Sequence, residues 1–215
     1  MKNVKYLKDG DKTITNDLDL FDISFMKRDD YFKNVDNYVK FVKSVEKLVR
    51  KHPDYDMFVS QVREERMEHC QILGHISRYD ATIEMHHGPM FTLFDYGAVI
   101  TNYHVFKGEA INTFMIAKEL LDAHFDNMVQ VVMLCKTAHQ AIDTGEIFIN
   151  LNQGIGDVMK FIKKYRSGMD NILIQKVNDY IDLSKKFDST DNNIFELEDK
   201  MISWSYRDQP SSLAM

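Results

Sequence analysis

Apolar residues recur at spacings of three and four through residues 29–50, a pattern that is typical of a long amphipathic helix. His52-Pro53 comes next, and this helix is expected to end there because proline does not continue a helix. The same periodicity predicts further helices over residues 54–69, 93–106, 109–125, 157–166 and 169–187. The chain is therefore expected to be mainly helical.

Two stretches interrupt the helical periodicity with patterns that favour strands. Residues 80–87 alternate, which places Glu84 and His86 on one strand face and His87 on the other. Gly88-Pro89 should end this strand, since proline cannot donate to a sheet ladder. Residues 129–134 are rich in β-branched side chains and predict a buried strand, directly followed by a short helix over residues 135–143.

Composition indicates a soluble globular protein with one main domain and additions at its ends, or two small domains. The chain has 215 residues, of which 44% are hydrophobic and 28% charged. No apolar run is long enough to cross a bilayer, and the first residues lack the apolar core of a signal peptide, so a cytoplasmic location is expected. Cys70 and Cys135 do not form a disulfide framework; both are expected to be small core residues, with metal ligation a minority interpretation.

Charge is unevenly distributed along the chain. The formal net charge of −6 argues mildly against a nucleic-acid partner, because phosphate contacts need lysine and arginine. Residues 27–51 nevertheless carry eight basic against four acidic side chains, and residues 157–186 carry seven against four. Residues 188–200 hold five acidic side chains and one lysine. The total therefore hides a candidate phosphate-facing surface beside an acidic tail.

The histidines of the first strand and the last short helix suggest a metal site. Adjacent His86 and His87 stand at a strand end, while His139 and Asp143 are four residues apart and share a helix face. Such a set can hold a divalent ion beside a general base. Because neighbouring strand residues point to opposite faces, His86 and His87 cannot do the same job: one can ligate a metal while the other faces a substrate. A plainer interpretation is that His86 and His87 cap a strand and His139 only packs.

The order of these features resembles the HNH, or ββα-metal (His-Me finger), endonuclease family. A strand ending in His86-His87 is followed by an insertion, a second strand and a helix with His139 and Asp143. This order is most similar to the phage and colicin-type branch, whose finger carries a His-His pair on its first strand and His-x-x-x-His on its helix. The resemblance covers residues 70–166, about half of the chain.

The resemblance implies a role for each matching residue. His87 would be the general base, and Asn127 lies near the asparagine that pins the loop below that base. His86 and His139 would ligate one divalent metal ion, with Asp143 standing where the second helix histidine usually does. A carboxylate there shifts the expected preference to Mg²⁺ or Mn²⁺, with Zn²⁺ or Ni²⁺ as further candidates.

Glu84 and a basic helix extend the expected site. Glu84 shares the strand face of His86, so it could orient a ligand or be an extra one. In phosphodiester hydrolysis a neutral imidazole takes the proton of the attacking water, and the ion neutralises charge on the leaving 3′ oxygen. The products would be 5′-phosphate and 3′-hydroxyl ends. Contacts to the nucleic-acid backbone are expected from Lys160, Lys163, Lys164 and Arg166.

The expected fold is α+β and predominantly helical, with a ββα-metal finger, a helical insertion and flanking helices. Residues 1–69 would be an N-terminal helical region, residues 70–166 the nuclease domain, and residues 167–215 a C-terminal helix and acidic tail. The expected function is a phage-encoded endonuclease acting on double-stranded DNA, with RNA as an open alternative.

A second function class is a catalytically inactive ββα-metal-fold phage protein that binds a host or virion component. The acidic net charge, Asp143 and the aromatic-containing tail favour it, and that tail is a candidate site for a protein partner.

Overall fold

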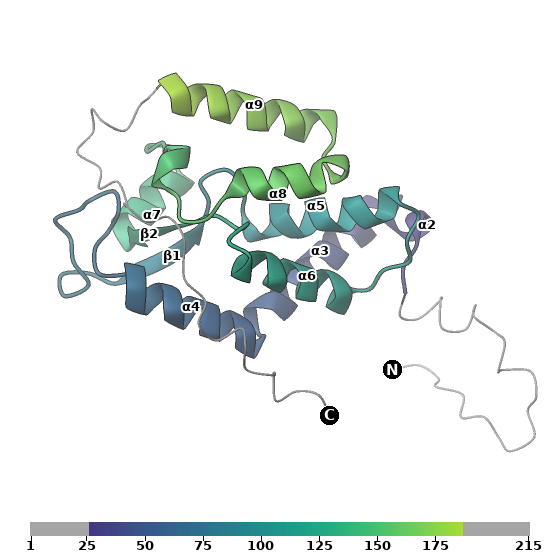
Figure 1. Cartoon of the computed structure of the whole chain (residues 1–215), viewed down its shortest axis with the longest axis horizontal. Coiled ribbons are helices and arrows are strands. Elements are labelled where there is room, and N and C mark those ends of the chain that lie inside the picture. Colours follow the sequence, from purple (N-terminus) through teal and green to yellow (C-terminus); the bar gives the residue numbers. More distant parts are fainter. Residues whose placement is uncertain (1–25, 187–215) are drawn as a thin grey trace, which may run out of the picture.

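The computed structural model describes residues 26–186, and most of these residues are helical (Figure 1). One two-stranded sheet accompanies the helices, which confirms the predicted α+β class with a predominance of helix. The acidic stretch 188–200, the aromatic tail residues after it and residues 1–25 lie outside the described part. None of the described helices is long and apolar enough to cross a membrane.

The elements follow one another much as the periodicity predicts. In chain order they are α2 (Asp29–Phe32), α3 (Val35–Arg50), α4 (Pro53–Arg66), β1 (Ile83–His87), α5 (Leu93–Phe106), α6 (Thr113–Phe125), β2 (Val131–Cys135), α7 (Lys136–Asp143), η1 (Leu151–Gln153), α8 (Val158–Tyr165), η2 (Arg166–Gly168) and α9 (Asn171–Lys186).

Side-chain caps decide where two helices begin, and there the predicted boundaries are wrong. The single helix expected over residues 29–50 is divided into α2 and α3. The Asn34 side chain accepts a hydrogen bond from the backbone N–H of Asn37 and so caps the beginning of α3. The helix expected from residue 109 starts at Thr113, because Asn112 caps it. Ile111 just before this cap is extended and pairs with Lys27.

The two strands pair antiparallel although α5 and α6 lie between them in sequence. His86 is opposite Val132 and His87 is opposite Val131. All of β2 is buried, as predicted, while β1 buries only Ile83 and His87 at its ends. β1 therefore has a more open face, which carries Glu84 and His86. This face meets α7, which lies beside the sheet in Figure 1.

One continuous hydrophobic core joins helices and sheet, with residues from Phe41 on α3 to Val177 on α9. Its centre is a cluster of aromatic rings in which Phe161 of α8 lies edge-on to Tyr96 of α5, with centroids 4.7 Å apart. The Tyr96 hydroxyl accepts the N–H of Gln130 at 2.9 Å, directly before β2. The core thus fixes the position of the strand that leads into α7.

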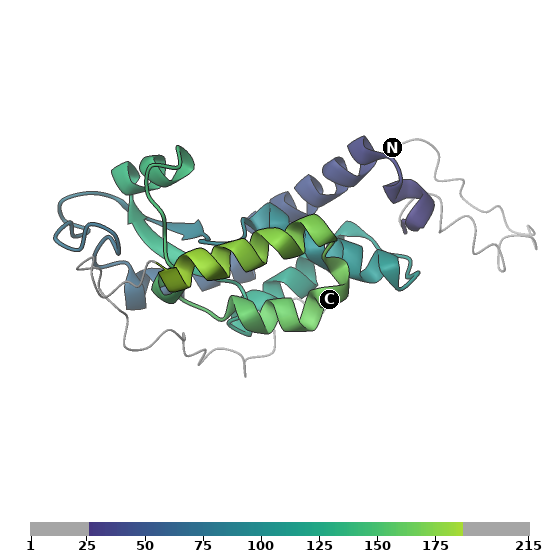
Figure 2. The same ribbon diagram turned by 90° about the horizontal axis from the view of Figure 1, so that it is seen from above.

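Helix α9 lies on the outside of the molecule, above α8 and α7 in the view of Figure 1, and runs across the front when seen from above (Figure 2). Three hydrogen bonds hold it to the segment around η1, one of them from the Leu151 backbone N–H to the Ser184 hydroxyl at 3.3 Å. The Tyr180 hydroxyl donates to the Ile149 carbonyl at 2.6 Å, and the Asn150 side-chain amide donates to the Ser184 carbonyl at 2.7 Å. One side of α9 is therefore anchored.

Replacing Phe161 by alanine should lower the free energy of unfolding by about 3–5 kcal/mol, because a fully buried aromatic side chain leaves a cavity. The matched control is Met159→Ala on the same helix, which should change stability by less than about 0.5 kcal/mol because Met159 is 48% exposed. Urea unfolding followed by circular dichroism measures both. Equal losses in the two variants would contradict a central role for Phe161.

Candidate metal centre

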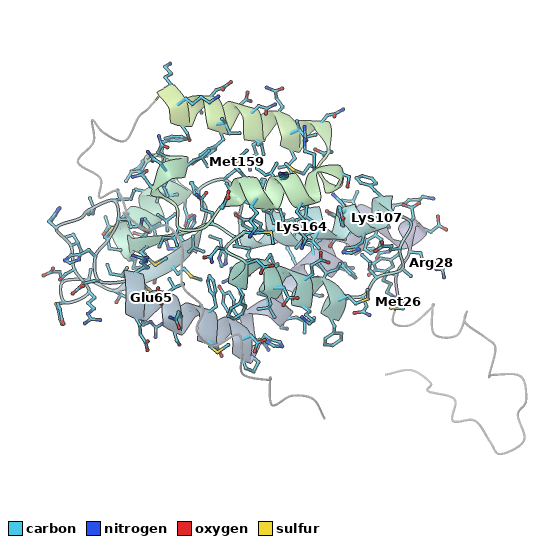
Figure 3. All side chains as sticks on the ribbon, in the orientation of Figure 1. Met26, Arg28, Glu65, Lys107, Met159 and Lys164 are labelled. Atoms are coloured by element: carbon cyan, nitrogen blue, oxygen red, sulfur yellow. The ribbon has the colours of Figure 1, made fainter. Side chains whose placement is uncertain are left out.

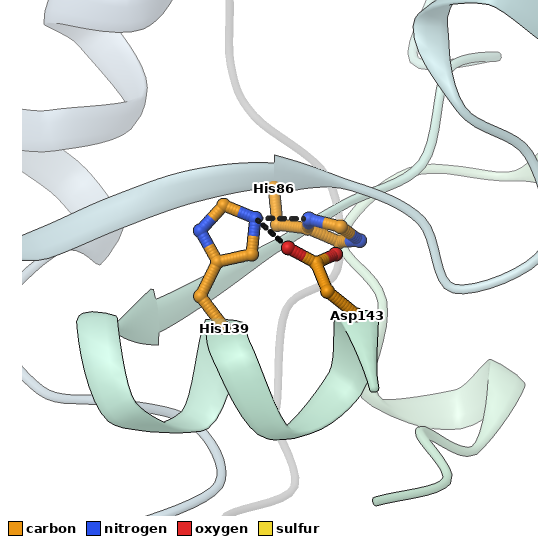
Figure 4. A group of neighbouring side chains, drawn as sticks. All are labelled: His86, His139 and Asp143. Carbon is orange, nitrogen blue, oxygen red and sulfur yellow. Dashed lines mark hydrogen bonds and ion pairs between the residues drawn. The ribbon is translucent and has the colours of Figure 1, made fainter. Parts of the chain in front are cut away.

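Three predicted ligand side chains from two elements meet at the surface of the ββα unit, which consists of β1, β2 and α7. His86 projects from β1, and His139 and Asp143 project from α7 (Figure 4). One ligand atom from each lies within 4.8 Å of the other two. His86 Nδ1 is 2.9 Å from His139 Nε2, and His139 Nε2 is 3.8 Å from the nearer Asp143 oxygen. Within residues 26–186 this is the one trio of His, Cys, Asp or Glu residues whose ligand atoms all lie that close to one another.

Local geometry explains why these residues converge. Strand alternation turns Glu84 and His86 to the side of the sheet that α7 covers. Helix α7 begins directly after Cys135, which pairs with Ile83 at the start of β1, so the helix lies beside β1 from its first turn. His139 and Asp143 are one helical turn apart and share a face.

The Glu84 carboxylate orients His139. His139 Nδ1 lies 3.0 Å from Glu84 Oε2, a hydrogen bond in which the ring N–H donates to the carboxylate. That bond leaves the Nε2 lone pair of His139 directed at His86 and Asp143. A carboxylate behind a ligating histidine is a common support of protein metal sites. The expectation that Glu84 could orient a ligand agrees with this geometry.

Protonation and exposure also suit an incoming cation. Burial, and then the neighbouring His139, lowers the pKa of His86, while Asp143 acts weakly in the opposite direction. His86 is therefore neutral at pH 7, as a metal-ligating imidazole must be. The Asp143 side chain is 63% exposed and that of His139 28% exposed, so the site opens to solvent on one side.

His87 lies apart from this cluster, on the opposite face of β1. Its Nε2 is 3.2 Å from Nε2 of His124 on α6, and its ring stacks on Tyr55 of α4. His124 Nδ1 donates to the Leu120 carbonyl at 2.7 Å, so its Nε2 accepts from His87. Both histidines are buried. The structure does not bring the predicted base beside the predicted ligands.

Asn127 serves the backbone turn between α6 and β2. Its φ of 53° lies in the left-handed region, which asparagine tolerates better than most residues. Its carbonyl accepts the N–H of Asp157 at 2.7 Å, which ties this turn to the start of α8. A role beneath a catalytic base stays a prediction for Asn127.

The predicted phosphate-binding residues belong to α8 and its end, where several contacts face α6. Lys160 Nζ donates to the Asp126 carbonyl at 3.2 Å, and Lys164 Nζ is 3.9 Å from Glu119 (Figure 3). Lys163 and Arg166 are exposed. Seen from above, α7 and α8 lie well apart (Figure 2), so these cations do not surround the metal cluster.

A polar network between α5, α6 and α8 was missed by reasoning from sequence. His104 hydrogen-bonds to Glu109 and lies 2.6 Å from Glu119 through Nε2. Burial opposes protonation of His104, but the two carboxylates outweigh it and raise its pKa. The Tyr165 hydroxyl donates to the other Glu119 oxygen at 2.7 Å. No spacing rule joins residues 104, 119 and 165, because only the packing of three helices brings them together.

Comparison with known proteins links the chain to bacteriophages. Residues 1–207 match the sequence model of a family described as bacteriophage G278-like virion protein. Neither the curated proteins nor the solved structures contain a match to the chain.

The buried His87–His124 pair predicts acid sensitivity. Burial lowers the pKa of His124 to about 4 from the ordinary 6.5, and it also lowers the pKa of His87. The unfolded chain therefore binds these protons at higher pH than the folded protein. Their contribution to stability is complete above about pH 6.5 and is lost as the pH falls toward 4.

Urea unfolding midpoints at a series of pH values from neutral to acidic measure this loss. For His124 alone we expect on the order of 3 kcal/mol across this range. His124→Gln should be less stable at neutral pH but show a flatter pH dependence, whereas the exposed control His75→Ala should follow the wild type. Parallel curves for wild type and His124→Gln would contradict this assignment.

Proposed function

The chain belongs to the bacteriophage G278-like virion protein family, and we propose that it is a metal-binding component of the phage particle. In this proposal it is made in the host cytoplasm and binds one divalent ion through His86, His139 and Asp143. The ββα unit then acts as a binding module and not as an enzyme. The observation that carries the proposal is the convergence of three ligand atoms whose central imidazole is oriented by a fourth residue, Glu84.

The donor set indicates which ion fits. Two imidazole nitrogens and one carboxylate oxygen suit Zn²⁺, Mn²⁺ or Ni²⁺, because imidazole is a good ligand for transition metals. Mg²⁺ prefers a shell of oxygen ligands in near-octahedral geometry, so the two histidines make it the weaker candidate. We therefore propose Zn²⁺ or Mn²⁺, with solvent completing the coordination on the exposed side.

The ion would hold α7 in place. This helix has eight residues, and only Ala138 among them is buried, so apolar packing contributes little to its attachment. His86 and the two α7 ligands come from elements far apart in sequence. An ion shared by them would replace the bond between His86 and His139 by a link from β1 to both turns of the helix. A ligand that binds only the folded state stabilises it by mass action.

Metal binding should be lost in His139→Ala and weakened in Asp143→Asn, because each substitution removes a ligand atom. Glu84→Gln should weaken binding by about 10–100-fold, since it disturbs only the orientation of His139. Isothermal titration with Zn²⁺ and Mn²⁺ measures these affinities, and a rise in melting temperature on adding metal should follow the same order.

His75→Ala is the matched control, because it removes an exposed histidine outside the cluster and should bind like the wild type. If wild type and His139→Ala bind either ion equally well, the proposed metal centre is wrong. If only Asp143→Asn behaves like wild type, the ion is held by the two histidines and solvent.

Phosphodiester hydrolysis is a second candidate function, favoured by the order of the elements. β1 pairs antiparallel with β2, α7 follows, and the ligands come from β1 and α7, as the resemblance to HNH endonucleases implies. A divalent ion supplies charge neutralisation to phosphate chemistry. Against this candidate, His87 would have to leave its contact with His124 before it could take a proton from water.

Incubation with plasmid DNA and with RNA separates the two functions. We expect wild type with Zn²⁺, Mn²⁺ or Mg²⁺ to leave both substrates as intact as His139→Ala does. Cutting by wild type that is lost in His139→Ala would instead support the nuclease. In that case the His87→Ala variant tests whether His87 is the general base. If circular dichroism shows that this variant is folded and its cutting is unchanged, His87 is excluded from that role.

A further inference from the structure

Helix α9 presents an outward face that no described element covers. Val177 and Ser184 are buried on its anchored side. On the other side Ile172 is 82% exposed and Leu183 is 42% exposed. These two aliphatic side chains and the charged residues between them make this face a candidate contact surface.

Five exposed residues form a stripe along this face: Ile172, Gln175, Lys176, Asp179 and Leu183. Their spacings of three and four place them on one side of the helix. Together with Asn171 and the half-buried Tyr180 they line a surface hollow, and no other element among residues 26–186 contributes to it. Lys176 has no carboxylate partner among residues 26–186, and Asp179 accepts only the side-chain amide of Gln175 there.

The stripe is complementary to itself when it is reversed. Its midpoint lies between Val177 and Asn178, and four of its residues form two pairs that are equidistant from this point. Ile172 mirrors Leu183, which pairs aliphatic with aliphatic. Lys176 mirrors Asp179, which pairs a cation with an anion.

We propose that a second copy of the chain docks on α9, with the two α9 helices antiparallel about a two-fold axis through that midpoint. A two-fold interface uses the same patch on both copies, so each favourable pair occurs twice. Lys176 then faces the partner's Asp179, and Ile172 packs on the partner's Leu183. A parallel arrangement in register would instead set Lys176 against Lys176 and Asp179 against Asp179, which charge repulsion disfavours.

The size of this contact sets the expected strength. Residues 172–183 span about 18 Å of helix, and one helix pair of this length covers less than the roughly 800 Å² per partner of a standard stable interface. Association should therefore be weak and concentration-dependent in solution. Several weak contacts can act together in a particle that holds many copies close to each other.

Sedimentation of the full-length protein from micromolar to near-millimolar concentration tests the dimer. Lys176→Glu should weaken dimerisation about tenfold or more, because it sets an acidic side chain against the partner's Asp179 in both symmetry-related pairs beside the two-fold axis. The double variant Lys176→Asp/Asp179→Lys reverses each pair and should restore association. Lys185→Glu is the matched control, with the same charge change on the same helix at a position outside the stripe.

Cysteine cross-linking tests the direction of the helices. The native Cys70 and Cys135 are buried, so they should not take part in cross-links between two copies. Ile172→Cys protein mixed with Leu183→Cys protein should form a cross-linked dimer under mild oxidation. Neither variant alone should do so to the same extent, because like positions lie at opposite ends of an antiparallel pair.

Three results would overturn the proposal. The first is a monomer at every concentration, and the second is a dimer that Lys185→Glu weakens as much as Lys176→Glu. The third is efficient cross-linking of Ile172→Cys with itself, which would indicate a parallel pair. None of these readouts uses the metal centre, so the two proposals fail independently.

Discussion

The alternation of side chains along β1 is the constraint on which the rest of this protein depends. Because neighbouring strand residues face opposite sides, the antiparallel pairing with β2 sends His86 toward α7 and His87 toward α4 and α6. A shift of one residue in the register would exchange the two histidines. The buried ends of β1 and the fully buried β2 hold this register, since slipping would expose apolar side chains.

Two adjacent residues of the same type therefore acquire different chemistry from their surroundings. His86 meets a second imidazole and a carboxylate at an open edge, where a neutral ring can offer a lone pair to a cation. His87 meets His124 inside the core, where burial disfavours its charged form and the pair contributes packing. This division explains why His86 can contribute to the proposed metal centre, whereas the burial of His87 weakens a nuclease mechanism that needs His87 as its base.

The surfaces of the protein are divided in a similar way. The ββα unit presents a small polar site built from two elements, β1 and α7, whereas α9 presents a long face of one helix whose other side is anchored by Tyr180 and Ser184. Membership of a virion protein family is compatible with both, because particles are built from repeated contacts between copies and other components. Metal binding at one site and self-association at the other would be separate properties of one chain.

Periodicity in the sequence determined the order of helices and strands, the two faces of β1, and the shared face of His139 and Asp143, because these depend on local geometry alone. It could not fix helix starts at Asn34 and Asn112, where single side chains cap the backbone. Only the tertiary structure decided that Glu84 would support His139 and that His87 would be buried against His124. Those contacts join residues more than 30 positions apart, and only the packing of α4, α6 and α7 around one small sheet brings them together.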